Sequence, residues 1–271
     1  MHRFLVVLAL SIMFVTATSG AATATSTPPL PGSMAAIGDS ITQAADVCCW
    51  YGDHPANSWS TGDAWWDGVS SHYERIRAAN PTIAGHQYNN AVSGARMSDA
   101  PAQAQRAVGQ QAKYVTILMG ANDLCTSSAA SMTPADTFRA QFRQTLAILK
   151  SDLPPRARIF VSSIPDVYQL WNLYHGDPIA EWVWSTAHIC QSMLSPSNTD
   201  ADRQAVRDRE AEFNTILAQE CGRYANCRFD GNAVFNYPFT RSHVSWLDYF
   251  HPSLAGQATL AEVTWRTSWW G

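Results

Sequence analysis

The apolar positions of the chain follow two alternating patterns. Short runs rich in β-branched and aromatic side chains indicate buried strands, and they cover residues 33–37, 87–92, 114–119, 158–162 and 227–229. Between these runs, apolar side chains recur at helical spacing over residues 59–79, 99–111, 133–150 and 200–221, and in a last segment that begins at residue 251. Strands that alternate with helices predict an α/β fold in which a parallel sheet lies between layers of helices.

The first residues of the chain have a different pattern. His2 and Arg3 precede an uninterrupted apolar run from Phe4 to Val15, and small residues follow this run. This order is typical of a secretory signal peptide, and the run is too short to span a bilayer comfortably. We therefore expect residues 1–24 to be a signal peptide, residues 25–32 a flexible leader, and residues 33–271 a single secreted domain without a stable membrane anchor.

Composition and charge narrow the classes of partner. The chain is 46% hydrophobic and 15% charged, which is typical of a globular protein rather than a disordered one. Its formal net charge is −4, and its only lysines are Lys113 and Lys150. Because the chain has no run of basic residues, we expect neither nucleic acid nor an anionic membrane surface as a partner.

Six cysteines follow the expected signal peptide: Cys48, Cys49, Cys125, Cys190, Cys221 and Cys227. An even number in an exported chain indicates disulfides, although six cysteines allow fifteen pairings. Cys221 and Cys227 flank a short loop, which favours a local bridge between them. The adjacent Cys48 and Cys49 are expected to pair elsewhere, because a bridge between neighbours strains the backbone. A metal site is disfavoured because the chain has no C-x-x-C pair.

Three polar loops follow predicted strands. They contain Gly38-Asp39-Ser40, Ser93-Gly94 and Gly120-Ala121-Asn122. Because the carboxyl ends of parallel strands lie at one edge of a sheet, where α/β proteins bind their ligands, these loops are expected to meet there.

Acyl transfer by a serine requires a hydroxyl, a base, a group that orients the base, and donors for the oxyanion. Ser40 offers the hydroxyl, and Asp248 and His251 offer a carboxylate and an imidazole that one turn can place together. Backbone N–H groups at Ser40 and Gly94 and the side-chain amide of Asn122 are possible oxyanion donors. Each feature alone also fits a turn or a helix start, so it is their combination that indicates catalysis.

This combination resembles the SGNH hydrolases, the GDSL-type esterase and lipase family. The matching blocks, in family order, are Gly38-Asp39-Ser40-Ile41, Asn90-Ala91-Val92-Ser93-Gly94, Gly120-Ala121-Asn122-Asp123 and Asp248-Tyr249-Phe250-His251-Pro252. Ile41 stands where the family name has Leu and keeps an apolar contact. The stretches SWSTGD and SHYERIRAANP, with several cysteines in an exported chain, are similar to secreted actinobacterial members.

The resemblance implies a three-layer α/β/α sandwich with a central parallel sheet and no cofactor or metal. It also implies that Ser40 is the nucleophile, His251 the base and Asp248 its partner, with Ser40, Gly94 and Asn122 forming the oxyanion hole. The expected function is ester hydrolysis by an esterase or lipase, and we expect a monomer.

Two other function classes are less well supported. A metal phosphoesterase would require an early Asp-x-His motif and further histidines, and His54, His72 and His86 lie in no such motif. A glycan-binding protein without catalysis would use some of the eleven tryptophans. We expect most of these in core-like positions, as at Trp65, Trp66, Trp265 and Trp269. The G-x-S-x-G motif of α/β-hydrolases is also absent from the sequence.

The substrate is less well determined than the chemistry. The expected family includes phospholipases and polysaccharide acetyl esterases as well as lipases. Residues 168–190 are dense in aromatic side chains and weakly periodic, so they either form an insertion that covers the site or belong to ordinary core packing. The apolar composition of residues 168–184 favours acyl chains over acetylated sugars.

Overall fold

The computed structural model describes residues 27–271, so the expected signal peptide lies outside the described residues. Its centre is a parallel sheet of five strands in the order β2-β1-β3-β4-β5. The strand bounds are Met34–Gly38 for β1, Gln87–Asn89 for β2, Tyr114–Leu118 for β3, Arg158–Val161 for β4 and Cys227–Phe229 for β5. All five predicted strands are present, and the order reverses between β1 and β3, where such sheets bind ligands.

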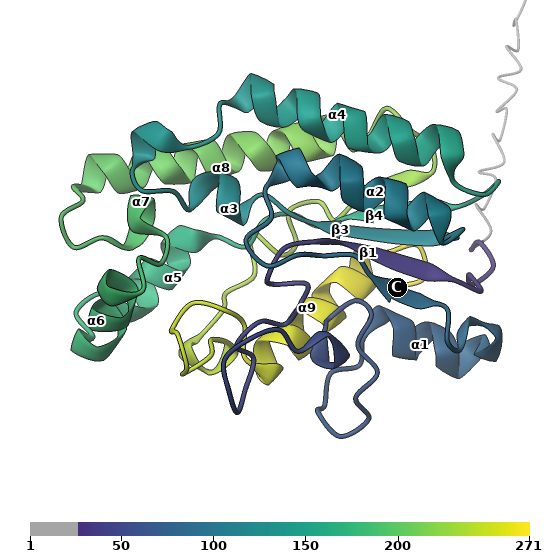
Figure 1. The fold of residues 1–271 in the computed structure, drawn as a ribbon, viewed down its shortest axis with the longest axis horizontal. Helices are drawn as coiled ribbons and strands as arrows, with labels where there is room; N and C mark the ends of the chain where they lie inside the picture. The colour runs from purple at the N-terminus through teal and green to yellow at the C-terminus, as the bar shows by residue number, and fades with distance from the viewer. Residues whose placement is uncertain (1–26) are drawn as a thin grey trace, which may run out of the picture.

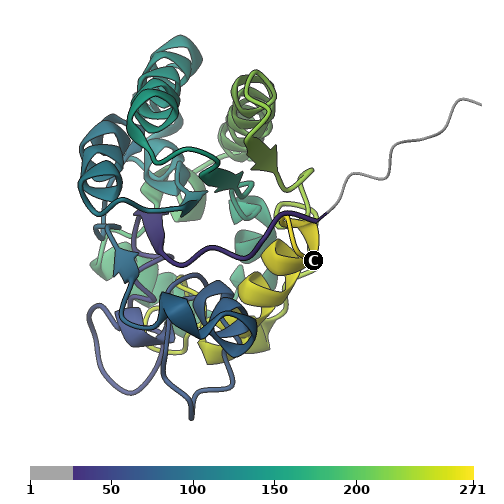
Figure 2. The same ribbon diagram turned by 90° about the vertical axis from the view of Figure 1, so that its right-hand side faces the viewer.

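Helices cover both faces of the sheet (Figures 1 and 2). One layer holds α2 (Ala100–Gly109), α4 (Ala135–Asp152) and α8 (Asp200–Cys221). The other holds α1 (His72–Ala79) and α9 (Leu254–Thr267). The buried side chains of β1, β3 and β4 pack against both layers, as in Ile37 toward one layer and Met34 toward the other. The predicted α/β architecture with a central parallel sheet is thus confirmed.

The predicted helix over residues 59–79 is wrong in its first half. The helix begins only at His72, where Ser71 accepts a hydrogen bond from the backbone N–H of Glu74 and the Glu74 carboxylate accepts one from Ser71. Before this cap, the chain turns tightly at Gly62, where a side chain would come within 2.5 Å of the Ser58 carbonyl. Polar and glycine residues therefore override the helical spacing of the apolar ones.

Trp65 and Trp66 lie in this turn-rich segment and are exposed, at 87% and 59% of their surface. The expectation that they belong to the core is therefore wrong. Trp265 and Trp269 are partly buried and pack against the smaller core cluster beneath α1, as expected. Helical spacing placed Trp65 on a buried face of a helix that does not form.

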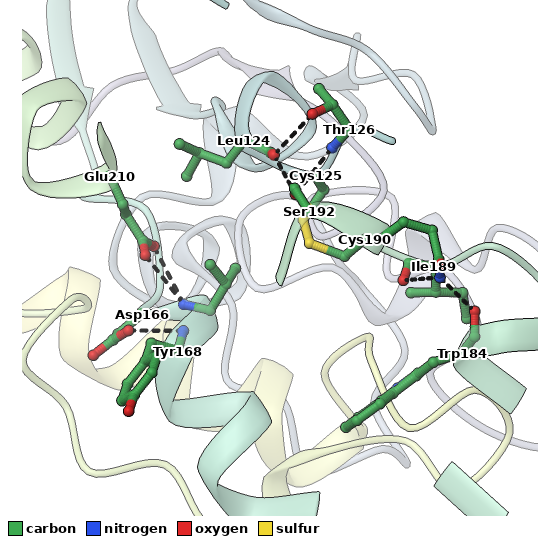
Figure 3. The surroundings of a disulfide bond; sticks show 12 residues. Leu124, Cys125, Thr126, Asp166, Tyr168, Trp184, Ile189, Cys190, Ser192 and Glu210 are labelled. Atoms are coloured by element: carbon green, nitrogen blue, oxygen red, sulfur yellow. Dashed lines mark hydrogen bonds between the residues drawn. A yellow bond between two sulfur atoms is a disulfide. The ribbon is translucent and has the colours of Figure 1, made fainter. Parts of the chain in front are cut away.

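The aromatic segment after β4 forms two helices, α5 (Val167–Tyr174) and α6 (Pro178–Thr186). Asp166 caps α5, because its side chain accepts hydrogen bonds from the backbone N–H groups of Tyr168 and Gln169. A disulfide between Cys125 and Cys190 then joins this segment to the loop after α3 (Ala121–Leu124), as Figure 3 shows. The short helix α7 (Gln191–Leu194) begins directly after Cys190. Closing a loop of 65 residues stabilises a fold by about 4 kcal/mol in the chain-entropy model.

The remaining cysteines correct one expectation and bear out another. Cys221 and Cys227 form the expected local bridge. Cys48 and Cys49 do not pair elsewhere, because the other four cysteines pair among themselves. Their thiols lie side by side, with the two sulfur atoms 2.8 Å apart. Within residues 27–271, no helix is both long and apolar enough to cross a membrane.

Candidate active site

Ser40 lies where β1 ends, at the reversal point of the sheet. The side-chain amide of Gln103 fixes the end of the strand, because it accepts from the Gly38 N–H at 2.8 Å and donates to the Gly38 carbonyl at 2.9 Å. Position 38 has no room for a side chain, since a Cβ there would lie 2.8 Å from the Leu118 carbonyl. Glycine therefore lets the chain leave the strand beside β3 and place Ser40 at the sheet edge.

A hydrogen-bonded turn holds Ser40 in place. The Asp39 carbonyl accepts from the N–H groups of Thr42 and Gln43, and the Ser40 carbonyl accepts from Ala45. The Asp39 side chain is fully buried and accepts from the Ile41 N–H at 3.0 Å. Burial raises the pKa of Asp39 to about 7. The Asp39 carboxyl group thus stabilises the turn through the Ile41 N–H and does not line the cleft.

His251 and Asp248 form a compact loop ahead of α9. The Asp248 Oδ1 atom accepts from the backbone N–H groups of Phe250 and His251, which orients the carboxylate toward the imidazole. The His251 Nδ1 atom lies 2.5 Å from Asp248 Oδ2, and Nε2 lies 2.7 Å from Ser40 Oγ. The structure therefore brings these three residues, predicted from motifs 211 positions apart, into one hydrogen-bonded chain.

Charge and burial act in opposite directions on this pair. Burial lowers the pKa of His251, but the carboxylates of Asp248, Asp46 and Asp39 raise it, and the result lies above the ordinary value. Burial raises the pKa of Asp248, but its hydrogen bond with His251 outweighs this, and the result lies below the ordinary value. An ionised carboxylate next to Nδ1 leaves Nε2 free to accept the Ser40 proton.

The three expected oxyanion donors come from the ends of β1, β2 and β3. Within residues 27–271, the N–H groups of Ser40 and Gly94 donate to no protein acceptor. Gly94 has a φ of +80°, a conformation that favours glycine. The Asn122 side chain donates to the Ala95 carbonyl at 3.0 Å, which uses one of its two N–H bonds. Its second N–H is left for another acceptor.

Asp123, the residue after Asn122, holds the segment that carries Asn122 in place. Asp123 is buried and accepts from the Met97 N–H at 2.8 Å and from the Thr133 hydroxyl at 2.7 Å. It therefore ties the start of α3 to the loops before α2 and α4, and burial raises its pKa. Sequence reasoning placed Asp123 in a family block without a role, and its contacts give it a positioning role.

An open cleft surrounds these groups. Its lining includes Ser40, Asp46, Tyr51, Asp53, Gly94, Asn122, Asp248 and His251, together with Val183, His188, Ile189 and Cys190 from α6 and the segment that follows it. A neighbouring hollow between α5 and the loop before α9 is lined by apolar side chains, including Leu170, Leu173, Phe239 and Leu260. The two hollows meet at Phe250 and His251. The aromatic segment is thus both a wall of the cleft and part of the packed core, through the buried Trp184.

One group of side chains is close enough together to hold a metal ion within the described part of the chain. It consists of Asp46, Asp248 and His251, with one ligand atom each within 4.8 Å of one another. A cation there would displace the hydrogen bond between His251 Nδ1 and Asp248. These residues therefore fit an acid–base role better than a metal centre.

Comparison with known proteins places this geometry in a family. A model of the family described as GDSL-like lipase/acylhydrolase matches residues 34–264. The chain belongs to this family. The match spans all five strands and every residue of the expected site, so the GDSL-type resemblance read from four short blocks is confirmed.

One relative and two solved structures to which this GDSL-family chain is similar share a quarter or less of its residues. A rat protein described as phospholipase B1, membrane-associated, is 25% identical over 230 residues, which cover 70% of this chain and 15% of the rat protein. An extracellular lipase from Streptomyces rimosus has a similar structure, with a TM-score of 0.51 and 16% identity over 87% of this chain and 99% of the lipase. A protein from Parabacteroides merdae described as a GDSL-like lipase also has a similar structure, with a TM-score of 0.52 and 17% sequence identity. The similarity covers 86% of this chain and 94% of that protein. These structural likenesses support the fold.

Two residues of the site were not predicted from the sequence. Asp46 contacts the His251 side chain from the turn after Ser40, and Gln103 holds Gly38 from α2. Neither lies in one of the four blocks. Gln103 sits on the buried face of a helix, where a polar residue at an apolar position is the one local sign of a buried hydrogen bond.

Proposed function

We propose that the protein is a secreted serine carboxylester hydrolase that works through an acyl-enzyme. The observation that carries this proposal is the continuous hydrogen-bonded chain from Ser40 through His251 to Asp248, beside N–H groups that have no protein acceptor. This is the arrangement that nucleophilic acyl transfer requires. The family match and the phospholipase relative support it.

In this mechanism, Ser40 Oγ attacks the ester carbonyl carbon while its proton passes to His251 Nε2. The carbonyl oxygen becomes an oxyanion and accepts hydrogen bonds from the N–H groups of Ser40, Gly94 and Asn122. Asp248 stabilises the imidazolium that forms. When the tetrahedral intermediate collapses, the carbon–oxygen bond to the alcohol breaks and the leaving oxygen takes the proton from Nε2.

Water then repeats these steps on the acyl-enzyme. His251 Nε2 takes a proton from water as the oxygen attacks the acyl carbon, and the bond to Ser40 Oγ breaks when the serine recovers its proton from Nε2. The carboxylic acid leaves, and the enzyme returns to its starting state. No metal or cofactor is needed in this scheme.

For the substrate, we favour esters with an apolar acyl chain. The hollow beside His251 is lined almost wholly by carbon, with Leu170, Leu173 and Phe239 among its walls. A hydrocarbon chain is stabilised in such surroundings, whereas a sugar ring would leave its hydroxyls without partners. A phospholipid ester fits the same reasoning, while an acetylated polysaccharide fits only the open cleft.

Hydrolysis of p-nitrophenyl esters from acetyl to palmitoyl tests the proposal. We expect the mature wild-type protein to turn over these esters in the presence of EDTA, and Ser40→Ala to lose nearly all activity while it keeps its melting temperature. Highest kcat/KM on medium or long chains supports the apolar hollow as the acyl site. Turnover that persists in Ser40→Ala, or that EDTA abolishes, would sink the serine mechanism.

A further inference from the structure

Asp46 is a second carboxylate on the Nδ1 side of His251, in addition to Asp248. It follows Ser40 by six residues, and the turn after β1 brings it to the far side of His251. Its Oδ2 atom lies 3.8 Å from His251 Nδ1, the same nitrogen that bonds to Asp248. Oxygen atoms of both carboxylates and Nδ1 all lie within 4.8 Å of one another.

Hydrogen bonds of both the side chain and the backbone fix the position of Asp46. Its Oδ1 accepts from the Gly52 N–H at 2.6 Å, and its own N–H donates to the Gly52 carbonyl at 2.8 Å. Its carbonyl accepts from the hydroxyl of Ser245, whose N–H bonds to the His251 carbonyl at 2.8 Å. The side chain is mostly buried, with 18% of its surface exposed. These bonds aim Oδ2 at the imidazole and join the turn after β1 to the loop before α9.

We propose that Asp46 is a positioning residue for His251, which stabilises its imidazolium together with Asp248 and can take over the Nδ1 hydrogen bond when Asp248 is removed. This inference rests on the proposed function. At 3.8 Å, Asp46 is beyond hydrogen-bond distance in the resting site, so it acts there through its charge. A small rotation of the ring would bring Nδ1 toward Asp46 once the Asp248 oxygen no longer competes for its proton.

The charges around His251 agree with this role. The carboxylates that raise the pKa of His251 are Asp248 from its own loop and Asp46 and Asp39 from the turn after β1. The other titratable groups that line the cleft are Tyr51, Asp53 and His188. Burial and the neighbouring Asp248 raise the pKa of Asp46 itself, as expected for two carboxylates that share one cation.

The test compares Asp46→Asn, Asp248→Asn and the double variant, with Asp63→Asn as the matched control. Asp63 is an exposed carboxylate in the same connection after β1. It is not among the groups that shift the pKa of His251. We expect Asp46→Asn to lower kcat with little change in KM and to move the acidic limb of kcat/KM down by roughly one pH unit, because the imidazolium loses a neighbouring anion. Asp63→Asn should leave both unchanged.

The double variant carries the sharper prediction. We expect Asp46→Asn to cost about ten times more activity in the Asp248→Asn background than in the wild type, because there Asp46 is the remaining carboxylate beside Nδ1. An equal cost in both backgrounds would overturn the proposal. So would a lowered melting temperature in Asp46→Asn with an unmoved pH profile, since that pattern belongs to a purely structural residue.

A measurement without turnover separates this inference from the proposed function. In the Ser40→Ala protein, NMR titration of the His251 ring, assigned by its loss in His251→Gln, reports the pKa directly. A lower pKa after Asp46→Asn supports the second carboxylate even if no tested ester is a substrate. An unchanged pKa contradicts it, whatever the enzyme hydrolyses.

Discussion

Two histidines precede or begin helices of the α1 and α9 layer, His72 fully buried and His251 with 15% of its side chain exposed, and their surroundings give them opposite chemistry. His72 begins α1, and its Nε2 lies 2.9 Å from Thr264 Oγ1 of α9. His251 lies three residues ahead of α9 and faces Ser40 and Asp248. One side chain has two hydroxyls as partners, and the other has a hydroxyl and a carboxylate.

The partners fix opposite tautomers. The Thr264 hydroxyl donates to the Leu260 carbonyl, so it accepts from Nε2–H of His72, and Nδ1 of His72 accepts from the Tyr114 hydroxyl. In His251, Nδ1–H donates to Asp248 and Nε2 is the acceptor. His72 is therefore satisfied as a neutral ring, whereas His251 is arranged to gain a proton.

The pKa values follow from the same difference. Burial among aromatic rings lowers the pKa of His72 to about 3, since no carboxylate offsets the loss of water. Carboxylates hold the pKa of His251 above its ordinary value although burial opposes this. Burial alone thus favours a neutral histidine, whereas burial beside an anion favours the protonated ring that the proposed base requires.

The largest expected effect separates the two histidines by activity. We expect His251→Ala to lower kcat on p-nitrophenyl esters by a factor on the order of 10⁴ or more, because Ser40 would lose its proposed base. His72→Phe should keep kcat close to wild type in folded protein. Steady-state kinetics on both variants, with circular dichroism as a check of folding, make the comparison. Equal losses of kcat would erase the distinction between a base and a structural ring.

A second prediction concerns the oxyanion donors beside His251. We expect Asn122→Ala to reduce kcat by about 10²- to 10³-fold with KM little changed, because its free N–H acts on charge that develops in the transition state. Asn226→Ala is the matched control. Its amide also donates to a backbone carbonyl, that of Ala157 at 3.0 Å, but at the opposite edge of the sheet. Full activity in Asn122→Ala would remove this residue from the proposed oxyanion hole.

Much of this arrangement could be predicted from the sequence, and the reasons are local. Strands β1, β3 and β4 are mostly apolar runs. The four blocks each lie at the end of a strand or just ahead of a helix, so a parallel sheet brings them together. Ser40, Gly94, Asn122, Asp248 and His251 all lie in such blocks. Pattern and topology are sufficient for residues whose position depends on the element that carries them.

Other features depend on contacts that no local pattern records. Asp46 is one acid in a turn, and it reaches His251 only because the chain folds back to Gly52. His72 looks like a polar residue at the start of a helix, and its burial depends on Tyr114 and Thr264, which are 42 and 192 positions away. The helix predicted around Trp65 was wrong because this apolar side chain lies in an exposed turn, and apolar side chains also occur on the surface.

The smallest expected effect tests His72 through stability. At pH 7, we expect His72→Phe to lower the free energy of unfolding by about 2–3 kcal/mol, because the Tyr114 and Thr264 hydroxyls lose a buried partner. The pKa of His72 is lower in the folded state than in the unfolded chain, so its contribution is present above pH 6.5 and is lost as the pH falls toward 3. The wild type therefore loses stability in acid on this account and His72→Phe does not, so the gap between them should narrow between pH 7 and pH 4. Urea unfolding at both pH values measures the gap. A constant gap would mean that His72 titrates normally in the folded protein, and the contrast with His251 would then rest on hydrogen-bond partners alone.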